Sequence, residues 1–185
     1  GKQQIGSYGL YFGRVTEEKG VETVIKAYEK LPEYTVKIMG DDTTDEAKRL
    51  KKYVENHKMK NVEFLGFKSG AELENVIKGA RFTLIPSIWY DNLPNTALES
   101  FQYSKPVIAS NIGSLPELVI DGENGYLFKP SNVEDLIKKI KMLDDDTLVK
   151  KMGQASRKRL ESRFAPQTHY EDLMKIFNEA VKSRK

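Results

Sequence analysis

The sequence contains no cysteine, only two histidines and no long apolar run, and each of these absences excludes a class of protein. Without cysteine, neither a disulfide framework nor a thiolate metal site can form. His57 and His169 lie far apart in the sequence, which argues against a zinc site. No stretch approaches the roughly 20 apolar residues that cross a bilayer, and no signal peptide is visible. These features predict a cytoplasmic protein.

Two nucleotide-binding motifs are also missing. The dinucleotide fingerprint G-x-G-x-x-G and the P-loop are both absent, which removes the main support for a nicotinamide-dependent dehydrogenase or a nucleoside triphosphatase. The formal net charge of +3 is too small to require a nucleic-acid partner, although it suits a small anionic ligand.

The 185 residues are 39% hydrophobic and 31% charged, as in a soluble globular protein, and suffice for one domain with a buried core. No linker, repeat or low-complexity segment divides them, so residues 1–185 are predicted to form a single domain. The sequence opens Gly1-Lys2-Gln3-Gln4 without a methionine and soon reaches an apolar segment. We therefore expect it to be a piece of a longer protein.

Short apolar runs alternate with segments of helical periodicity along the chain. Six strands are predicted, at residues 10–12, 36–39, 62–65, 82–85, 107–109 and 126–128. Helices are predicted over 21–31 and 46–56, from residue 69, from residue 95 or 96, and from residue 132 to the end. Capping boxes, formed by Ser69 with Glu72 and by Ser131 with Glu134, mark two of the helix starts.

This alternation of strands and helices indicates βαβ units and hence a parallel sheet. The predicted fold class is α/β, a Rossmann-like doubly wound parallel sheet of about six strands with helices on both faces and a helical C-terminal tail. Ligands of such sheets bind beyond the carboxyl ends of the strands. The residues that follow each apolar run are therefore the candidates for function.

The segment after the first predicted strand combines a glycine with two cations. Gly13 lets a ligand approach the backbone closely, and Arg14 and Lys19 come just before a helix. A guanidinium, an ammonium and a helix N-terminus all favour an anion, which suits a diphosphate. The alternative is that both cations belong to a solvated loop.

The segment after the fourth predicted strand carries two carboxylates, Asp91 in a loop and Glu99 about one turn into the next helix. They flank a helix N-terminus whose free amides, with the Thr96 hydroxyl, can donate hydrogen bonds to phosphate oxygens. Carboxylates can accept hydrogen bonds from sugar and ribose hydroxyls. The alternative is an ordinary loop aspartate and a glutamate that interacts with the helix dipole.

Taken in order, these segments resemble the C-terminal domain of the group-1 family of retaining GT-B glycosyltransferases. Residues 11–31, YFGRVTEEKGVETVIKAYEKL, are similar to the family's G-R-x(4)-K-G loop and the helix after it. Residues 85–128 resemble its E-x7-E region, its P-V-I-A-S strand, and its G-G-x-P-E and D-G-x-N-G turns. The resemblance covers nearly the whole chain.

By this resemblance, Arg14 and Lys19 hold the diphosphate of a nucleotide-sugar donor, with Gly13 beside them. Glu99 binds the ribose, and Asp91 faces the hydroxyls of the transferred sugar. The candidate catalytic residues are then Arg14, Lys19, Asp91 and Glu99. The other residues expected at the donor are Asn92, Leu93, Pro94, Asn95 and Thr96.

The sequence departs from the family pattern in the acidic region. The first acid of the pair is normally glutamate, and here it is Asp91, one methylene shorter. The usual glycine-rich loop is replaced by Asn92-Leu93-Pro94-Asn95, which resembles a subgroup with W-x-E-N-x-P, and its proline removes one amide donor. Ser114 replaces the second glycine of the G-G turn. Contacts to the donor sugar must therefore differ in detail.

The resemblance implies transfer of a sugar from a nucleoside diphosphate donor to a hydroxyl acceptor with retention, in polysaccharide, lipopolysaccharide or glycolipid synthesis. It implies no cofactor and no metal, because protein cations stabilise the departing diphosphate. The expected partners are the donor, an acceptor glycan or lipid-linked sugar, and an N-terminal domain that supplies most of the acceptor site, but no nucleic acid. The last helix, near residues 164–177, is expected to cross onto that domain, and this chain alone would not complete catalysis.

Two other functions stay open. One is a different GT-B enzyme, such as a sugar-nucleotide epimerase or a sugar synthase. The other is a non-catalytic sugar-nucleotide-binding subunit, since Asp91 replaces the usual glutamate.

Three further features have competing interpretations. Asp41 and Asp42, with Lys105, are similar to a phosphoreceiver pocket, but the acidic pair follows the second strand, so we expect a loop that caps a helix at Thr44. Trp89-Tyr90 either stacks on a sugar or anchors its loop by packing. A basic tract is either a solvated helical face or a contact with an anionic membrane surface at the inner face. Its residues are Lys138, Lys139, Lys141, Lys150, Lys151, Arg157, Lys158 and Arg159.

Overall fold

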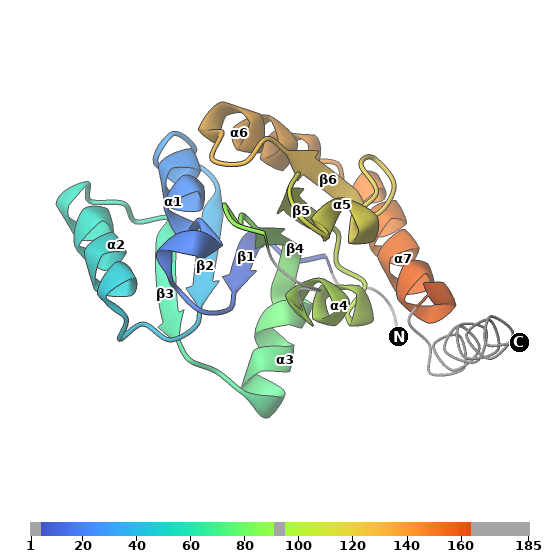
Figure 1. Ribbon diagram of the computed structural model, residues 1–185, viewed down its shortest axis with the longest axis horizontal. Coiled ribbons are helices and arrows are strands. Elements are labelled where there is room, and N and C mark those ends of the chain that lie inside the picture. The colour runs from blue at the N-terminus through green and yellow to red at the C-terminus, as the bar shows by residue number, and fades with distance from the viewer. Residues whose placement is uncertain (1–4, 91–94, 164–185) are drawn as a thin grey trace, which may run out of the picture.

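The computed structural model describes residues 5–90 and 95–163. All six predicted strands are present in one sheet (Figure 1). They are β1 (Tyr8–Phe12), β2 (Thr35–Met39), β3 (Val62–Gly66), β4 (Ala80–Ile85), β5 (Val107–Ser110) and β6 (Gly125–Phe128). The strand bounds differ from the predicted ones by at most two residues, because short apolar runs mark buried parallel strands well.

The strands lie in the order β3-β2-β1-β4-β5-β6, and every pair is parallel. Successive strands move outward from β1 to β3, and β4 then returns to the other side of β1. This return makes a topological switch point between β1 and β4, where open α/β sheets have a crevice at the carboxyl ends of their strands. The predicted Rossmann-like α/β fold is confirmed.

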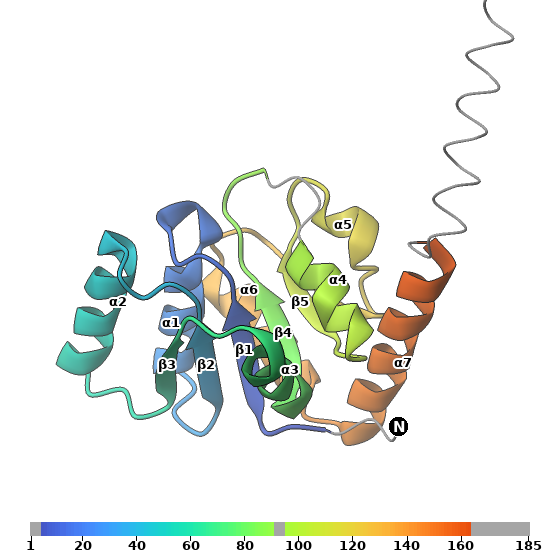
Figure 2. The ribbon, with the colours of Figure 1, turned by 90° about the horizontal axis from the view of Figure 1, so that it is seen from below.

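The helices cover both faces of the sheet, as predicted (Figure 2). One face packs against α1 (Val21–Glu29), α2 (Asp45–Asn56) and α6 (Val133–Met142). The other face packs against α3 (Gly70–Gly79), α4 (Asn95–Gln102) and the short α5 (Leu115–Leu118), which was not predicted. A 3-10 turn, η1 (Glu17–Lys19), precedes α1, and α7 (Asp146–Arg163) closes the β6 edge and contacts α4.

Side chains of each strand alternate between two apolar layers. In β1, Tyr11 packs with α1, α2 and α6, whereas Leu10 and Phe12 pack with α3. The predicted apolar face of the first helix is confirmed, because Val21, Val24, Ile25 and Tyr28 are all buried. No helix within residues 5–90 and 95–163 combines the length and the hydropathy that crossing a membrane requires.

The two predicted capping boxes are wrong. Ser69 precedes α3 in an extended conformation, but its side chain accepts no hydrogen bond from the first turn. At α6 the cap is Asn132, whose side chain accepts a hydrogen bond from the Asp135 amide at 2.9 Å. Ser131 cannot take this place because it lies one residue earlier, in a left-handed turn with a φ of +60°.

The predicted cap of the helix at Thr44 is confirmed, because its hydroxyl accepts a hydrogen bond from the Ala47 amide at 3.1 Å. The predicted helical tail is present as α6 and α7 up to Arg163, and its last part, 164–177, lies outside the described residues.

Candidate functional site

Three glycines lie at the carboxyl ends of the first three strands. The Gly13 amide donates a hydrogen bond to the Met39 carbonyl at 3.0 Å, and the Gly40 amide donates one to the Gly66 carbonyl, also at 3.0 Å. Gly13 has a φ of +144° and Gly66 one of +68°, which other residues rarely adopt. The chain can therefore turn sharply at this edge, and its backbone is open to a ligand.

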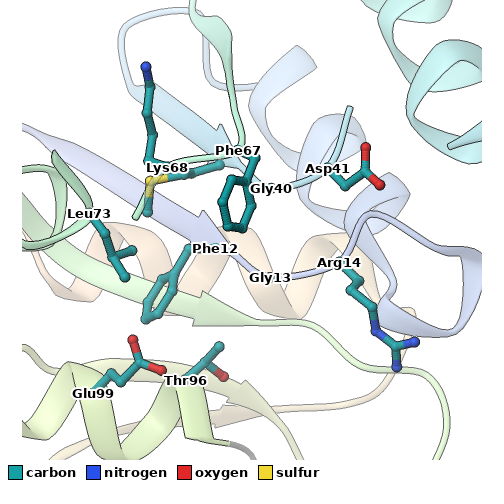
Figure 3. Close-up of a pocket in the computed structure, with 11 residues that line it drawn as sticks. Phe12, Gly13, Arg14, Gly40, Asp41, Phe67, Lys68, Leu73, Thr96 and Glu99 are labelled. Carbon is teal, nitrogen blue, oxygen red and sulfur yellow. The ribbon is translucent and has the colours of Figure 1, made fainter. Parts of the chain in front are cut away.

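A cavity of about 490 Å³ lies at this edge, between the loops after β1, β2 and β3 and the first turns of α4 (Figure 3). It is next to the switch point, where a ligand is expected in this fold. Its lining residues are Phe12, Gly13, Arg14, Met39, Gly40, Asp41, Phe67, Lys68, Leu73, Thr96 and Glu99.

Helix α4 presents Thr96 and Glu99 to the cavity, because residues three apart share one face of a helix. The opposite face is fixed to the sheet by buried hydrogen bonds. The Thr83 hydroxyl of β4 donates to Ser100 Oγ at 2.7 Å, and the Ser100 hydroxyl donates to the Thr96 carbonyl at 2.6 Å. Since Phe101 is also fully buried, α4 holds its cavity-facing residues on a rigid support.

The Glu99 carboxylate points from α4 toward Phe12 in the cavity (Figure 3). Burial raises the pKa of the Glu99 carboxyl above its ordinary value. Among residues 5–90 and 95–163, none donates a hydrogen bond to this carboxylate. A half-buried acid without a donor is well suited to accept hydrogen bonds from ligand hydroxyls.

The cations of the first loop occupy different positions. Arg14 is exposed and lines the cavity, and no carboxylate in the described part of the chain forms an ion pair with it. Lys19 ends η1 and is half-buried, outside the cavity lining. The loop between them is fixed to the end of β4, where the Ile88 amide donates to the Glu18 carbonyl at 3.0 Å.

The structure thus brings four of the predicted site residues around one cavity, namely Gly13, Arg14, Thr96 and Glu99. Asn95 is exposed and is the first residue of α4, which agrees with the predicted helix start at residue 95 or 96. The predicted residues Asp91, Asn92, Leu93 and Pro94 lie outside the described residues.

The apolar end of the cavity was not predicted. Phe67 leaves 73% of its surface exposed there, and Leu73, Phe12 and Met39 continue the apolar lining. These residues come from three strand ends and from α3, so only the folded sheet brings them together. A large apolar residue in a loop directly after a strand was the available signal at Phe67.

The acidic loop after β2 is explained by local bonds. The Asp41 carboxylate accepts hydrogen bonds from the amide and hydroxyl of Thr43, which lower the pKa of its carboxyl. Asp42 forms an ion pair with Lys51. Lys105 lies before β5, at the amino ends of the strands and so at the opposite end of the sheet from the acidic loop. Its amine donates a hydrogen bond to the Ala80 carbonyl at 2.7 Å. These residues therefore do not form a phosphoreceiver pocket.

The D-G-x-N-G turn has a structural role. Asn124 is fully buried, accepts a hydrogen bond from the Ile120 amide at 2.7 Å and donates one to the Leu118 carbonyl at 3.1 Å. A Cβ on Gly125 would lie 1.9 Å from the Val107 carbonyl oxygen, so only glycine allows β6 to approach β5. The turn joins α5 to β6 and does not reach the cavity.

The basic tract lies on α6 and α7, where three of its residues have partners within the protein and the other five are exposed. Lys139, Arg157 and Arg159 bind Asp121, Glu161 and the Glu117 carbonyl, respectively. The exposed lysines are Lys138, Lys141, Lys150, Lys151 and Lys158. Within the described part of the chain, no three His, Cys, Asp or Glu side chains are grouped so that they could hold a metal ion.

Comparison with known proteins identifies relatives of this chain. It matches the family described as glycosyl transferases group 1 over residues 6–159. An uncharacterised glycosyltransferase of Methanocaldococcus jannaschii is 30% identical over 174 residues, which cover 94% of this chain and 48% of that protein. The chain therefore spans about half the length of this relative.

Solved structures have the same fold. The C-terminal domain of a group 1 glycosyl transferase from Francisella tularensis aligns with a TM-score of 0.75 at 26% identity, covering 88% of both chains. The Anabaena protein HepE, in complex with UDP and glucose, aligns with a TM-score of 0.83 at 22% identity over 94% of this chain and 48% of that one. The chain belongs to the group 1 glycosyltransferase family and has the Rossmann-like fold of one half of a GT-B enzyme.

Proposed function

We propose that this chain binds the nucleoside diphosphate sugar donor of a retaining glycosyltransferase, which transfers the sugar to a hydroxyl of a glycan or a lipid-linked sugar. The observation that carries the proposal is the composition of one cavity at the switch point of the sheet. It has an exposed guanidinium, Arg14, a half-buried carboxylate, Glu99, and an apolar end with an exposed aromatic ring, Phe67. A nucleotide offers a matching phosphate, ribose and base.

The apolar end suits the nucleobase. A flat base can stack on the exposed Phe67 ring, and Leu73 and Met39 add apolar surface beside it. The part of the cavity lined by Gly13, Arg14 and α4 is less suited to a base, because it presents backbone, a guanidinium and the polar side chains of α4.

The carboxylate of Glu99 suits the ribose. Its oxygens can accept hydrogen bonds from both ribose hydroxyls, and its partial burial makes those bonds stronger than they would be in water. The ribose would then lie between the base at Phe67 and the phosphates at Arg14.

The diphosphate would lie at Arg14, over the open backbone at Gly13 and near the first amides of α4. Lys19, on the following turn, adds a second positive charge to the same edge of the sheet. During transfer, negative charge develops on the leaving diphosphate, and fixed cations and amides stabilise it without reorganisation. Protein cations therefore take the role that a metal has elsewhere, and Asp91 would face the transferred sugar.

The rest of the active site would come from a part of the protein that this chain does not contain. The chain spans about half the length of a relative that it matches, and its cavity lies at the carboxyl ends of the strands. Most of the acceptor site is therefore assigned to another domain. We expect the chain to bind donor and to turn over none.

A thermal-shift screen against UDP, GDP, ADP, dTDP and their sugars tests the proposal. A ligand at about 100 times its dissociation constant stabilises the fold by about 2.7 kcal/mol, which such a screen detects. Stabilisation by at least one of these nucleotides is expected, and stabilisation by none would refute the proposal. A nucleotide-product assay on the full-length protein would separate a transferase from an epimerase, a sugar synthase or a non-catalytic subunit.

A further inference from the structure

Two aromatic rings project from the end of β4 and have no assigned role. Trp89 leaves 69% of its surface exposed and Tyr90 leaves 76%. The chain just before them is firmly held, because Ser87 is buried and the Ile88 amide donates a hydrogen bond to the Glu18 carbonyl at 3.0 Å. The backbone is thus fixed up to residue 88, and the two rings then extend into solvent. They do not anchor the loop by packing.

The surroundings of the two rings fit a small ligand better than a protein surface. Among residues 5–90 and 95–163, the other exposed large apolar side chains are Phe67, in the cavity, and Met142, on α6. Exposed Glu17, Glu18 and Asn95 lie on the elements that flank the loop. A stable protein interface needs about 800 Å² per partner with an apolar centre, and two rings among polar residues do not supply it.

The chemistry of the rings fits a pyranose. A sugar ring has an apolar face of C–H groups, which packs against the electron-rich face of an aromatic ring, while its hydroxyls stay at the edge. Tryptophan and tyrosine also carry an N–H and an O–H that can bind those hydroxyls. A phosphate would gain little from the electron-rich face of Trp89 and would instead be attracted to the Arg14 guanidinium in the cavity.

The position of the rings separates them from the donor. Neither Trp89 nor Tyr90 lines the cavity, so a ring bound on them lies outside the donor cavity. They follow β4 and so lie at the same end of the sheet as the cavity, and the described part of their loop rises between the η1 loop and α4 (Figure 2). A Cβ on Gly20 would lie 2.0 Å from the Pro86 carbonyl oxygen, so the two loops are in direct contact.

We propose that Trp89 and Tyr90 form a platform for a sugar ring of the acceptor, at the same end of the sheet as the donor cavity. The proposal rests on the proposed function, because it uses the position of the donor to define the acceptor side. It assigns a binding position in this chain to a sugar ring of the proposed glycan or lipid-linked acceptor.

Trp89 is the only tryptophan in the sequence, so its fluorescence reports on the platform directly. The chain would be titrated with methyl α-glucoside, methyl α-mannoside, methyl α-galactoside, maltose and cellobiose, each in the presence of saturating UDP or GDP. A blue shift or a saturable quenching of Trp89 emission by at least one of these sugars is expected. No response to any of them would overturn the proposal and leave the rings as a contact for another part of the protein.

Variants test whether the platform itself binds. Tyr90→Ala keeps the Trp89 reporter and removes one ring, so it should weaken sugar binding about fivefold. Tyr90→Phe keeps the ring and should bind nearly as well as the parent. Met142→Ala is the matched control, because it removes an exposed apolar side chain from α6, outside the cavity lining, and should leave sugar binding unchanged. Equal losses in Tyr90→Ala and Met142→Ala would overturn the proposal.

Two further measurements separate this proposal from the proposed function. Calorimetric titration of UDP and GDP, without sugar, tests nucleotide binding alone. Nucleotide binding without a sugar response refutes the platform and keeps the donor site. Sugar binding without nucleotide binding refutes the acceptor assignment together with the proposed function. A Trp89 response to UDP-glucose or GDP-mannose, but to no free sugar, would assign the rings to the donor and overturn the proposal.

Discussion

The carbonyl oxygen of Gly13 lies 1.9 Å from the position that a Cβ on Gly40 would occupy. The loops after β1 and β2 can therefore lie this close only because residue 40 has no side chain. Both glycines line the cavity, so the same contact determines its floor.

Gly40→Ala should displace the Gly13 loop and lower the free energy of unfolding by about 3 kcal/mol, because the clash is with backbone that cannot rotate away. Nucleoside diphosphate affinity should fall as well, since Arg14 is attached to the displaced loop. Gly70→Ala is the control: its φ of +55° makes the change strained, but no atom lies near the added methyl, so about 1 kcal/mol is expected. Chemical denaturation and calorimetric titration measure both effects, and equal affinities in the two variants would contradict the prediction.

Arg14→Ala should weaken the binding of a nucleoside diphosphate without changing the stability of the fold, because the side chain is exposed and forms no ion pair with a described residue. The loss of one charge-assisted contact costs about 1.5–3 kcal/mol, or roughly a ten- to hundredfold increase in dissociation constant. Lys48→Ala removes the same charge from an exposed position on α2 and should leave binding unchanged. Lys19→Ala, measured beside it, decides whether a cation outside the cavity lining also contributes. Equal effects of Arg14→Ala and Lys48→Ala would show a general charge effect instead of a site.

The sequence predicted the fold better than the site. Strand positions follow from short apolar runs, and the end of each strand identified Gly13, Arg14 and Glu99 as candidates. The apolar end of the cavity could not be found in this way, because Phe67 and Leu73 meet Met39 only through the pairing of β2 with β3. Local sequence contains no information on that strand order.

The wrong helix cap at Ser131 and the unpredicted burial of Lys105 each have a specific structural cause. The predicted box at Ser131 has the right residue spacing, but a left-handed backbone at that serine moves the helix start to Asn132. Spacing alone cannot distinguish these two caps, which differ by one residue. Lys105 was considered only as part of a phosphoreceiver-like pattern with Asp41 and Asp42, and its burial could not be predicted because it depends on the packing of α3 against β4.

Lys105 should make stability depend on pH in the alkaline range. It is 2% exposed, and its amine donates hydrogen bonds to the carbonyls of Lys78 and Ala80, at the end of α3. Burial lowers the pKa of the Lys105 ammonium to about 8, from an ordinary value of 10.5. Between these two values the unfolded chain holds the proton and the folded chain does not, so the free energy of unfolding rises with pH, by at most about 1.4 kcal/mol per unit.

Denaturation between pH 7.5 and about 9.5, below the ordinary range of tyrosine, measures this slope. Lys105→Met should abolish it and should also lower stability by about 1–3 kcal/mol, because two carbonyls lose a donor. Lys78→Met changes an exposed side chain and keeps the Lys78 carbonyl, so the slope should remain. An identical pH slope in the parent and in Lys105→Met would mean that Lys105 keeps its proton in the fold.

Glu99→Gln should move stability and ligand affinity in opposite directions. Burial raises the pKa of this carboxyl in the fold, so the folded protein binds its proton more readily than the unfolded chain. Below the pKa that this carboxyl has in the unfolded chain, it is neutral in both states. The free energy of unfolding then falls as pH rises through the pKa that it has in the folded protein. At neutral pH the ionised Glu99 therefore destabilises the fold, and a neutral glutamine should raise the melting temperature at pH 7 but not at pH 4.

The same change should weaken nucleotide binding. A glutamine offers one carbonyl oxygen in place of two charged ones, so the hydrogen bonds to the ribose lose about 1.5–3 kcal/mol, or roughly ten- to a hundredfold in affinity. Glu123→Gln removes the same charge from an exposed turn far from the cavity, and neither quantity should change. Thermal denaturation at the two pH values and calorimetric titration at pH 7 give both numbers on one sample. If Glu99 only packs, Glu99→Gln should lower stability and leave nucleotide affinity unchanged. If Glu99 binds the ribose, the variant should be more stable at pH 7 and bind nucleotide more weakly. The reason is that a half-buried carboxylate without a donor destabilises the free protein, and the hydroxyls of the bound ligand supply the missing hydrogen bonds.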